Sequence, residues 1–247
     1  MYTYVIGDIH GCYNEFLHML DKIDYQDDDE IICVGDYIDR GSQSYEMLKW
    51  IESSPDNFLL IQGNHEAEFT ANIDILISFS QQIGLNSNDI EDTKVLYRAV
   101  SMIPQIHEAH FDYYNTINVL IHKYNITLTE LSKWSYIMKQ MPHMYTKTVN
   151  GTKYIITHAG YRRNDIDYNL YAREESFSNN NVVIAGHTPT IMNDMFAYNN
   201  GNIYEKYDSI YNGKYINIDC GCAYKNDKHA KLACIRLEDM MKFYVIS

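Results

Sequence analysis

The sequence is short of cysteine, of positive charge and of long hydrophobic runs, and each shortage excludes a class of protein. Its five cysteines are an odd number without the spacing of a small disulfide-stabilised scaffold. No apolar stretch approaches the ~18–20 residues that a membrane-spanning helix needs. The opening segment MYTYVIGDIHG has neither the basic segment nor the apolar core of an export signal. These shortages predict reduced thiols, a cytoplasmic location and no membrane partner.

The charge balance is acidic, with 33 Asp and Glu against 20 Lys and Arg and a formal net charge of −13. A broad basic surface for nucleic-acid phosphates is therefore not expected. Local positive charge can still come from bound metal ions. Arginine is scarce, so an arginine inside a motif carries more information than usual. The length of 247 residues and the hydrophobic fraction of 46% predict a globular protein of one or two domains, and one is the better count.

The first 66 residues alternate between strand and helix signals. Three apolar runs predict buried strands, and two segments between them carry apolar residues at helical spacing. The predicted strands are 2–8, 30–36 and 58–64, and the predicted helices are 14–23 and 44–51. This order predicts βαβ units with right-handed crossovers and a parallel section of sheet.

The rest of the chain divides into a helical part and a part made of short strands. Residues 67–148 have helix-compatible sequence with weak apolar periodicity, which predicts a helical insertion or cap. The last hundred residues return to strand signals, with few helix signals between them. Those strands are expected at 153–160, 181–189, 215–221, 232–239 and 241–247. They predict a second, more antiparallel sheet packed on the first, within a single domain spanning 1–247.

Polar side chains follow directly after these predicted strands. Gly7, Gly35 and Gly63 stand 28 residues apart, and each leads a stretch bearing Asp, Asn or His: GDIHG, GDYIDRG and GNHE. THAG and GHTP follow later strands in the same way. Because open α/β sheets bind ligands beyond the carboxyl ends of their strands, one site assembled from several strand ends is expected. The delivered side chains are Asp8, His10, Asp36, Asp39, Arg40, Asn64, His65, His158 and His187.

This set of side chains predicts a metal site, although no member does so alone. A single aspartate after a strand is commonly a helix cap, and a lone histidine usually satisfies a local hydrogen bond. Carboxylate, imidazole and amide oxygen together suit divalent ions of intermediate hardness, such as Mn²⁺, Fe or Zn²⁺. Two aspartates, three histidines and one asparagine could serve two ions if one aspartate bridges them. The pattern therefore favours a dinuclear hydrolytic site.

The ordered motifs GDIHG, GDYIDRG, GNHE, THAG and GHTP resemble those of the PPP-type metallophosphoesterases, which have the calcineurin-like fold. That family includes serine/threonine phosphoprotein phosphatases and symmetrical diadenosine tetraphosphate hydrolases. The resemblance covers residues 2–66 and 153–221, and the middle segment carries none of it. It implies an α/β fold in which two mixed β-sheets pack as a sandwich flanked by helices, with the helical insertion at 67–148.

The resemblance also implies a role for each motif residue. The implied metal ligands are Asp8 and His10 for a first ion, Asp36 as the bridge, and Asn64, His158 and His187 for a second ion. Mn²⁺ is the expected metal, with Fe or Zn²⁺ as alternatives. A metal-bound hydroxide would be the nucleophile, and His65, oriented by Asp39, the general acid. Arg40 and Arg173 would hold the phosphoryl oxygens, and Arg162 and Arg163 compete with Arg173 for that role.

Two motif residues favour a phosphorylated protein or peptide as substrate over other phosphoesters. Glu66 of GNHE and Asp39 of DRG resemble the phosphoprotein phosphatases, and NIDCGCAY resembles the compact bacterial and phage enzymes. The alternative is a hydrolase of dinucleoside polyphosphates or a nucleic-acid-end phosphatase, both acting on small or terminal phosphoesters. A catalytically silent binding protein is disfavoured, because every metal, acid and arginine position is filled.

Overall fold

The computed structural model describes residues 1–103 and 115–247, and their strands form two five-stranded sheets. The first sheet has the strand order β10-β9-β1-β2-β3. Its strands are β1 (Thr3–Ile6), β2 (Glu30–Cys33), β3 (Phe58–Leu60), β9 (Lys231–Arg236) and β10 (Met241–Ile246). β1, β2 and β3 run parallel, whereas β9 pairs antiparallel with both β1 and β10.

Two helices connect the three parallel strands of this sheet. α1 (Tyr13–Lys22) and α2 (Ser44–Glu52) occupy the segments that the apolar periodicity predicted. α1 buries Phe16 and Met19, and α2 buries Met47 and Leu48, in one cluster with the outward residues of β1 and β2. The predicted βαβ organisation of the first 66 residues is therefore confirmed.

The second sheet has the strand order β4-β5-β6-β8-β7. Its strands are β4 (Met144–Val149), β5 (Thr152–Thr157), β6 (Val182–Ala185), β7 (Tyr204–Asp208) and β8 (Gly213–Asn217), and α8 (Ile166–Tyr171) lies between β5 and β6 in the chain. β5, β6 and β8 are parallel, and β4 and β7 pair antiparallel at the two edges. Asn150 and Gly151 both have positive φ angles in the tight turn that joins β4 to β5.

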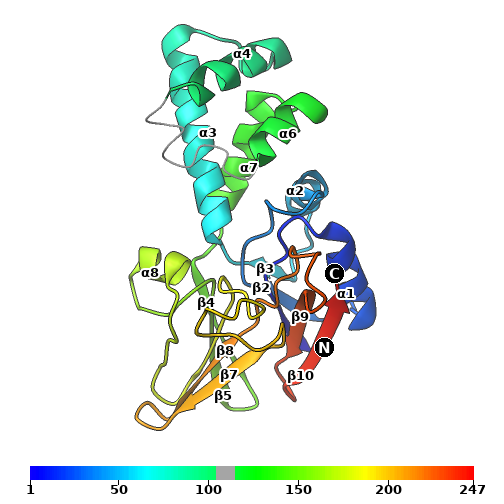
Figure 1. Ribbon diagram of the computed structural model, residues 1–247, viewed down its shortest axis with the longest axis vertical. Coiled ribbons are helices and arrows are strands. Elements are labelled where there is room, and N and C mark those ends of the chain that lie inside the picture. The colour runs from blue at the N-terminus through cyan, green and yellow to red at the C-terminus, as the bar shows by residue number, and fades with distance from the viewer. Residues whose placement is uncertain (104–114) are drawn as a thin grey trace.

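The two sheets pack face to face, as the family resemblance implied (Figure 1). Inward side chains of both sheets form one buried cluster. They include Val5, Ile32 and Ile235 from the first sheet and Ile156, Ile184 and Ile216 from the second. Alternate residues of the same strands, such as Ile6 and Cys33, face the helices on the other side. Both faces of the central strands are therefore buried, which explains their continuous apolar runs.

Three features of the sheets differ from the sequence-based expectation. β9 and β10 join the first sheet rather than the second, because β9 pairs with β1 and places Ala233 and Ile235 in the space between the sheets. β4 starts at Met144, inside the range predicted as helical. β7 was not predicted at all. β4 and β7 are edge strands with several half-buried or exposed polar residues, so neither carries a clear apolar pattern.

The helical insertion projects from the sheets in Figure 1 and contains four described helices. They are α3 (Asn64–Ile83), α4 (Ile90–Ser101), α6 (Thr116–Lys123) and α7 (Leu128–Lys139). Asp89 caps α4 by accepting backbone N–H groups, and Thr127 caps α7 within a capping box. Residues 104–114 of the predicted insertion lie outside the described part. Among the described helices, none combines the length and apolarity needed to cross a membrane.

Candidate metal centre

Six parallel strands from the two sheets end beside one another and deliver polar side chains to one place. Each strand contributes a residue within four positions of its end: Asp8 after β1, Asp36 after β2, Asn64 after β3, His158 after β5, His187 after β6 and Asp219 after β8. Each of these six residues is at most 8% exposed. The two sheets therefore act together as the scaffold of one buried polar site.

The backbone at this site is strained. His10, Asp36, Asp39, Arg40 and His187 all have φ angles between 48° and 71°, a left-handed conformation that non-glycine residues rarely adopt. Each such residue costs on the order of 1–3 kcal/mol and persists only where the surrounding structure enforces it. Close packing of neighbouring backbone adds a second constraint. A Cβ atom at Gly63 would lie 2.2 Å from Oδ1 of Asp36, so only glycine fits there.

The first group of candidate ligands consists of His10, Asp36 and His65, whose ligand atoms all lie within 4.8 Å of one another. Nδ1 of His10 lies 3.0 Å from the carbonyl oxygen of Ile38, to which it donates. This hydrogen bond fixes the tautomer, so the lone pair of Nε2 faces Asp36, 3.4 Å from Oδ2. A neutral imidazole and a carboxylate directed at the same point are a suitable donor set for a divalent cation.

The second group consists of Asp36, His158 and His187, and Asn64 joins it through its amide oxygen. Oδ1 of Asn64 lies 2.9 Å from Nε2 of His158 and 2.9 Å from Nδ1 of His187, and these two nitrogens are 3.2 Å apart. Nδ1 of His158 is committed to the carbonyl oxygen of Val34, 3.0 Å away, so its Nε2 carries a lone pair. Acceptor therefore faces acceptor here, an arrangement that a shared cation would resolve.

Asp8 lies beside these groups rather than within either of them. Its Oδ2 accepts the backbone N–H of His187 at 2.9 Å. Its Oδ1, like Nε2 of His187, is buried without a hydrogen-bond partner among the described residues. Burial, and then the charges of Asp219 and Asp36, raise the pKa of Asp8 well above its usual value. A nearby cation would relieve both the missing partner and the cost of this buried charge.

The protonation states at the centre suit metal binding. Burial raises the pKa of Asp36, but the surrounding imidazoles, His158 first, outweigh burial and bring the pKa far below its usual value. Burial lowers the pKa of His10 and His158, and it lowers that of His187 to about 2. Burial therefore favours neutral imidazoles at His10, His158 and His187, the form in which histidine binds divalent ions.

His65 differs from the other histidines because a second carboxylate holds it. Its Nδ1 lies 2.6 Å from Oδ2 of Asp39. Burial lowers the pKa of His65, but the charge of Asp36 and the hydrogen bond to Asp39 outweigh burial and raise the pKa above its usual value. Nε2 of His65 lies 3.4 Å from Nη2 of Arg40. A proton donor and a guanidinium group therefore meet beside the candidate metal ligands.

Arg173, Arg162 and Arg163, the three candidates for holding the phosphoryl oxygens, have different surroundings. Nη1 of Arg173 donates to the carbonyl oxygen of His187 at 3.4 Å, which places this guanidinium at the centre. Arg162 instead pairs with Asp165 at 3.1 Å and stacks on the ring of Tyr168, with its guanidinium carbon 3.8 Å from the ring centroid. Arg163 is exposed. Arg40 and Arg173 are therefore the two arginines with contacts to site residues.

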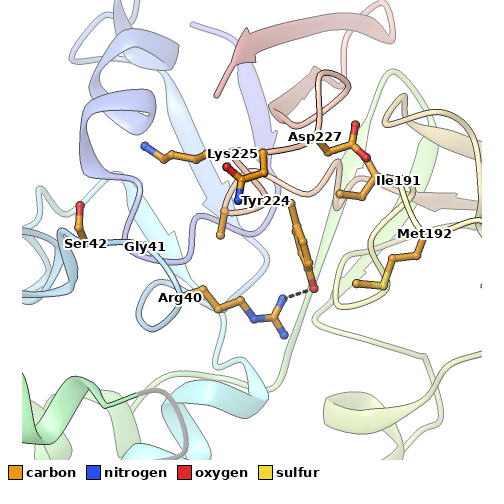
Figure 2. Close-up of a pocket in the computed structure, with 10 residues that line it drawn as sticks. Arg40, Gly41, Ser42, Ile191, Met192, Tyr224, Lys225 and Asp227 are labelled. Atoms are coloured by element: carbon orange, nitrogen blue, oxygen red, sulfur yellow. Dashed lines mark hydrogen bonds between the residues drawn. The ribbon is translucent and has the colours of Figure 1, made fainter.

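A pocket of about 690 Å³ opens beside Arg40. Figure 2 shows Arg40 bonded to the hydroxyl of Tyr224, with Ile191 and Met192 across the pocket and Lys225 nearby. The hydrogen bond from Nη1 of Arg40 to Oη of Tyr224 is 3.1 Å long. The pocket combines the guanidinium group of Arg40 with apolar and aromatic surface, and Arg40 connects it to His65.

Glu66, which the sequence analysis took as a sign of a phosphoprotein substrate, contacts the backbone of two loops at the centre. Glu66 is fully buried, and its carboxylate accepts the N–H groups of Tyr37 at 2.8 Å and of Gly63 at 3.0 Å. It also accepts the N–H of Asp36 at 2.8 Å. Glu66 thus joins the loop after β2 to the loop after β3. These backbone contacts occupy its carboxylate and explain how Glu66 holds the two loops together.

Two other residues at the centre were not among the predicted site residues. Asp219 follows β8 as Asp8 follows β1, a sequence signal that could have identified it, and its Oδ2 is buried without a described partner. Thr116 comes from α6 of the insertion, and its Oγ1 donates to Oδ1 of Asp39 at 2.5 Å. No sequence motif surrounds Thr116, so only the tertiary structure could reveal it.

Comparison with known proteins gives consistent results. Residues 1–218 match the family profile described as calcineurin-like phosphoesterase. A curated relative from Buchnera aphidicola, named bis(5'-nucleosyl)-tetraphosphatase, symmetrical, is 42% identical over 72 residues. That match spans 29% of this chain and only 26% of the relative.

Solved structures agree on the fold. A protein serine/threonine phosphatase from Saccharomyces cerevisiae superimposes with a TM-score of 0.56 at 12% identity, covering 100% of this chain and 81% of that one. A metallophosphoesterase from Sphaerobacter thermophilus gives a TM-score of 0.53 at 13% identity, covering 99% and 86%. At these identities the likeness shows the fold alone.

Proposed function

The chain belongs to the calcineurin-like phosphoesterase family, and from this premise we propose that it is a divalent-metal-dependent hydrolase of dinucleoside tetraphosphates. The contact between two lone-pair atoms, Oδ1 of Asn64 and Nε2 of His158, carries the metal-dependent part of the proposal. The names of the curated relatives support this substrate. The matched region of the first of them is about a quarter of that relative's length. This substrate was the alternative of the sequence analysis, and the findings favour it over the first choice.

We assign the centre as follows. Two divalent cations, Mn²⁺ by preference and Fe or Zn²⁺ as alternatives, would neutralise phosphate charge and lower the pKa of water. The residues proposed to hold them are Asp8, His10, Asp36, Asn64, His158 and His187. Arg40 and Arg173 would donate to the phosphoryl oxygens, for which the guanidinium fork is well suited. His65 would give its Nε2 proton to the leaving oxygen, with Asp39 holding the opposite side of its ring.

The pocket beside Arg40 supports a nucleotide as substrate. Its volume of about 690 Å³ lies in the range of small-molecule sites. Tyr224, Ile191 and Met192 present surfaces suited to a base, while the guanidinium of Arg40 suits a phosphate adjoining it. A long polyphosphate chain could therefore extend from this pocket across the metal centre.

A phosphorylated serine or threonine side chain is the second candidate substrate, and the Asp39–His65 pair favours it. A nucleoside diphosphate leaves readily without a proton, whereas an alkoxide leaving group needs one from a positioned acid. The hydrogen bond of 2.6 Å between Nδ1 of His65 and Asp39 provides such an acid. The likeness to a serine/threonine phosphatase structure concerns the fold and adds no support for this substrate.

One parallel assay separates these candidates. Diadenosine tetraphosphate and a phosphoserine peptide are offered to the Mn²⁺-loaded protein, and products are followed by chromatography. We expect kcat/KM for the dinucleotide to exceed that for the peptide at least about 10-fold, with ADP as the only nucleotide product. A preference for the peptide would transfer the proposal to the second candidate. If Asp36→Asn were as active as the original protein on both substrates, the assignment of the site would be wrong.

A further inference from the structure

In the described part of the chain, helix α6 of the insertion reaches the Asp39–His65 pair through one hydroxyl group, on Thr116. Both oxygens of Asp39 are engaged: Oδ2 by Nδ1 of His65 at 2.6 Å and Oδ1 by Oγ1 of Thr116 at 2.5 Å. Asp39 and Thr116 are each only 8% exposed. The backbone N–H of Asp39 is also satisfied, by Oγ of Ser44 at 3.0 Å. Thr116, Asp39 and His65 therefore form a buried chain of hydrogen bonds that ends at the candidate metal centre.

α6 is held so that Thr116 stays in place. At its far end Tyr124 stacks on Tyr45 of α2, with ring centroids 4.1 Å apart and an interplanar angle of 17°. Oη of Tyr124 also donates to Glu46 at 3.4 Å. The buried face of α6, with Ile117, Leu120 and Ile121, belongs to the same apolar cluster as α1 and α2. Packing at both ends thus fixes the distance between the insertion and the loop after β2.

We propose that Thr116 is a positioning residue for proton transfer, acting on His65 through Asp39. The proposal rests on the proposed phosphoester hydrolysis with His65 as its acid, and it concerns substrates whose leaving oxygen needs a proton. In that reaction the oxygen of water forms a bond to phosphorus and releases a proton to solvent. The bond from phosphorus to the leaving oxygen breaks, its electron pair stays on that oxygen, and the Nε2 proton of His65 joins it. Thr116 restricts Asp39 to the orientation that directs Nε2 toward the substrate.

Replacing the hydroxyl leaves Asp39 buried with one oxygen unpaired. Thr116→Val has almost the same shape as threonine, so packing is preserved while the donor is lost. Asp39 can then rotate, and the direction of the His65 ring is less well defined. The loss should be felt only when the leaving group needs a proton, because a stable leaving anion departs without help. A general defect in the insertion would instead slow all substrates equally.

The test compares two aryl esters, phenyl phosphate with a poor leaving group and p-nitrophenyl phosphate with a good one. For Thr116→Val we expect kcat to fall about 10-fold on phenyl phosphate and less than about 2-fold on p-nitrophenyl phosphate. Thr116→Ser retains a donor and should recover most of the loss. The matched control is Thr93→Val in α4, which removes another buried hydroxyl of the insertion, one that donates to the carbonyl oxygen of Asp89 and accepts the N–H of Leu128. It should affect both substrates alike.

A spectroscopic measurement makes the outcome independent of turnover. The proton shared by Nδ1 of His65 and Asp39 should give a low-field proton NMR signal, assigned by its loss in His65→Asn. Thr116→Val should shift or broaden this signal, whereas Thr116→Ser and Thr93→Val should keep it. An equal fall on both esters, or an unchanged signal in Thr116→Val, would overturn the positioning role. If the original protein hydrolyses neither aryl ester, the NMR signal alone decides on Thr116, and the proposed function is decided separately by the assay with diadenosine tetraphosphate and the phosphoserine peptide.

Discussion

The sheet-bearing part and the helical insertion contribute to the centre in different ways. Six strand ends of the sheets bring carboxylates, imidazoles and an amide together on a strained backbone. The insertion is built with ordinary helix caps and an apolar interior. Its first helix, α3, carries His65 in its first turn, and among the other described residues of the insertion one hydroxyl, on Thr116, bonds to Asp39. The strand ends therefore supply most of the candidate ligands, and we propose that the insertion adjusts their chemistry through Thr116. The shared apolar cluster supports our proposal that residues 1–247 form a single metallophosphoesterase domain.

The largest effect is expected from a change of Asp36, the carboxylate that both ligand groups of the sheets share. Asp36→Asn keeps the shape and the oxygen that accepts the N–H of His65 at 3.2 Å, but it removes the charge common to both ligand groups. We expect activity on p-nitrophenyl phosphate to fall at least about 10³-fold, because the cations would no longer be held. Bound metal, measured by mass spectrometry after dialysis, should fall as well. Full metal content with full activity would contradict the assignment of Asp36.

A substitution of Glu66 tests whether the stability of the protein depends on the buried hydrogen bonds between the loops after β2 and β3. Glu66→Gln places an amide N–H₂ against the backbone donors of Asp36, Tyr37 and Gly63, so the free energy of unfolding should fall by about 3 kcal/mol. Chemical denaturation measures this change. The matched control is Glu91→Gln, which changes a glutamate in the first turn of the insertion helix α4, where its side chain is 76% exposed. That change should cost less than about 0.5 kcal/mol.

The same residue can test the substrate argument. Glu66→Asp should lower stability without changing the ratio of activities on diadenosine tetraphosphate and a phosphoserine peptide, because the side chain contacts backbone. A reversal of that preference would show that Glu66 influences substrate choice after all.

Substitutions of Arg173 and Arg162 test which of these two arginines belongs to the centre. Arg173→Ala should lower kcat/KM by about 10²-fold, equivalent to about 2.7 kcal/mol, because one donor to the phosphoryl oxygens is lost. Arg162→Ala should stay within about 2-fold, since that side chain faces Asp165 and Tyr168. Steady-state kinetics on the preferred substrate measure both. The opposite ranking would mean that Arg162 turns toward the substrate.

The smallest expected effect concerns the contact between the two regions. A double-mutant cycle with Tyr45→Leu and Tyr124→Leu should give a coupling free energy of about 1 kcal/mol, as expected for a stacked aromatic pair. Each single change should also slow phenyl phosphate more than p-nitrophenyl phosphate, because α6 carries Thr116. Zero coupling would show that this stack does not join the insertion to α2.

Much of the centre could be predicted because its signals are local. Asp8, Asp36 and His187 each follow a short apolar strand, and a strand end is visible in the sequence as a change from apolar to glycine and polar residues. Asp219 has the same local signal and was overlooked. The roles of Glu66 and Arg162 were not predictable in this way, because each depends on which partner lies within reach after folding.

The sequence by itself determined the alternation of strands and helices, the chemical types of the candidate ligands and the family resemblance. These follow from periodicity and from residue order, which act over a few neighbouring positions. Only the tertiary structure decided that β9 and β10 complete the first sheet, that Arg173 rather than Arg162 contacts the centre, and that Thr116 reaches Asp39. Thr116 lies 77 residues from Asp39 in the chain. A contact over such a separation depends on how helices and sheets pack, which no local pattern records.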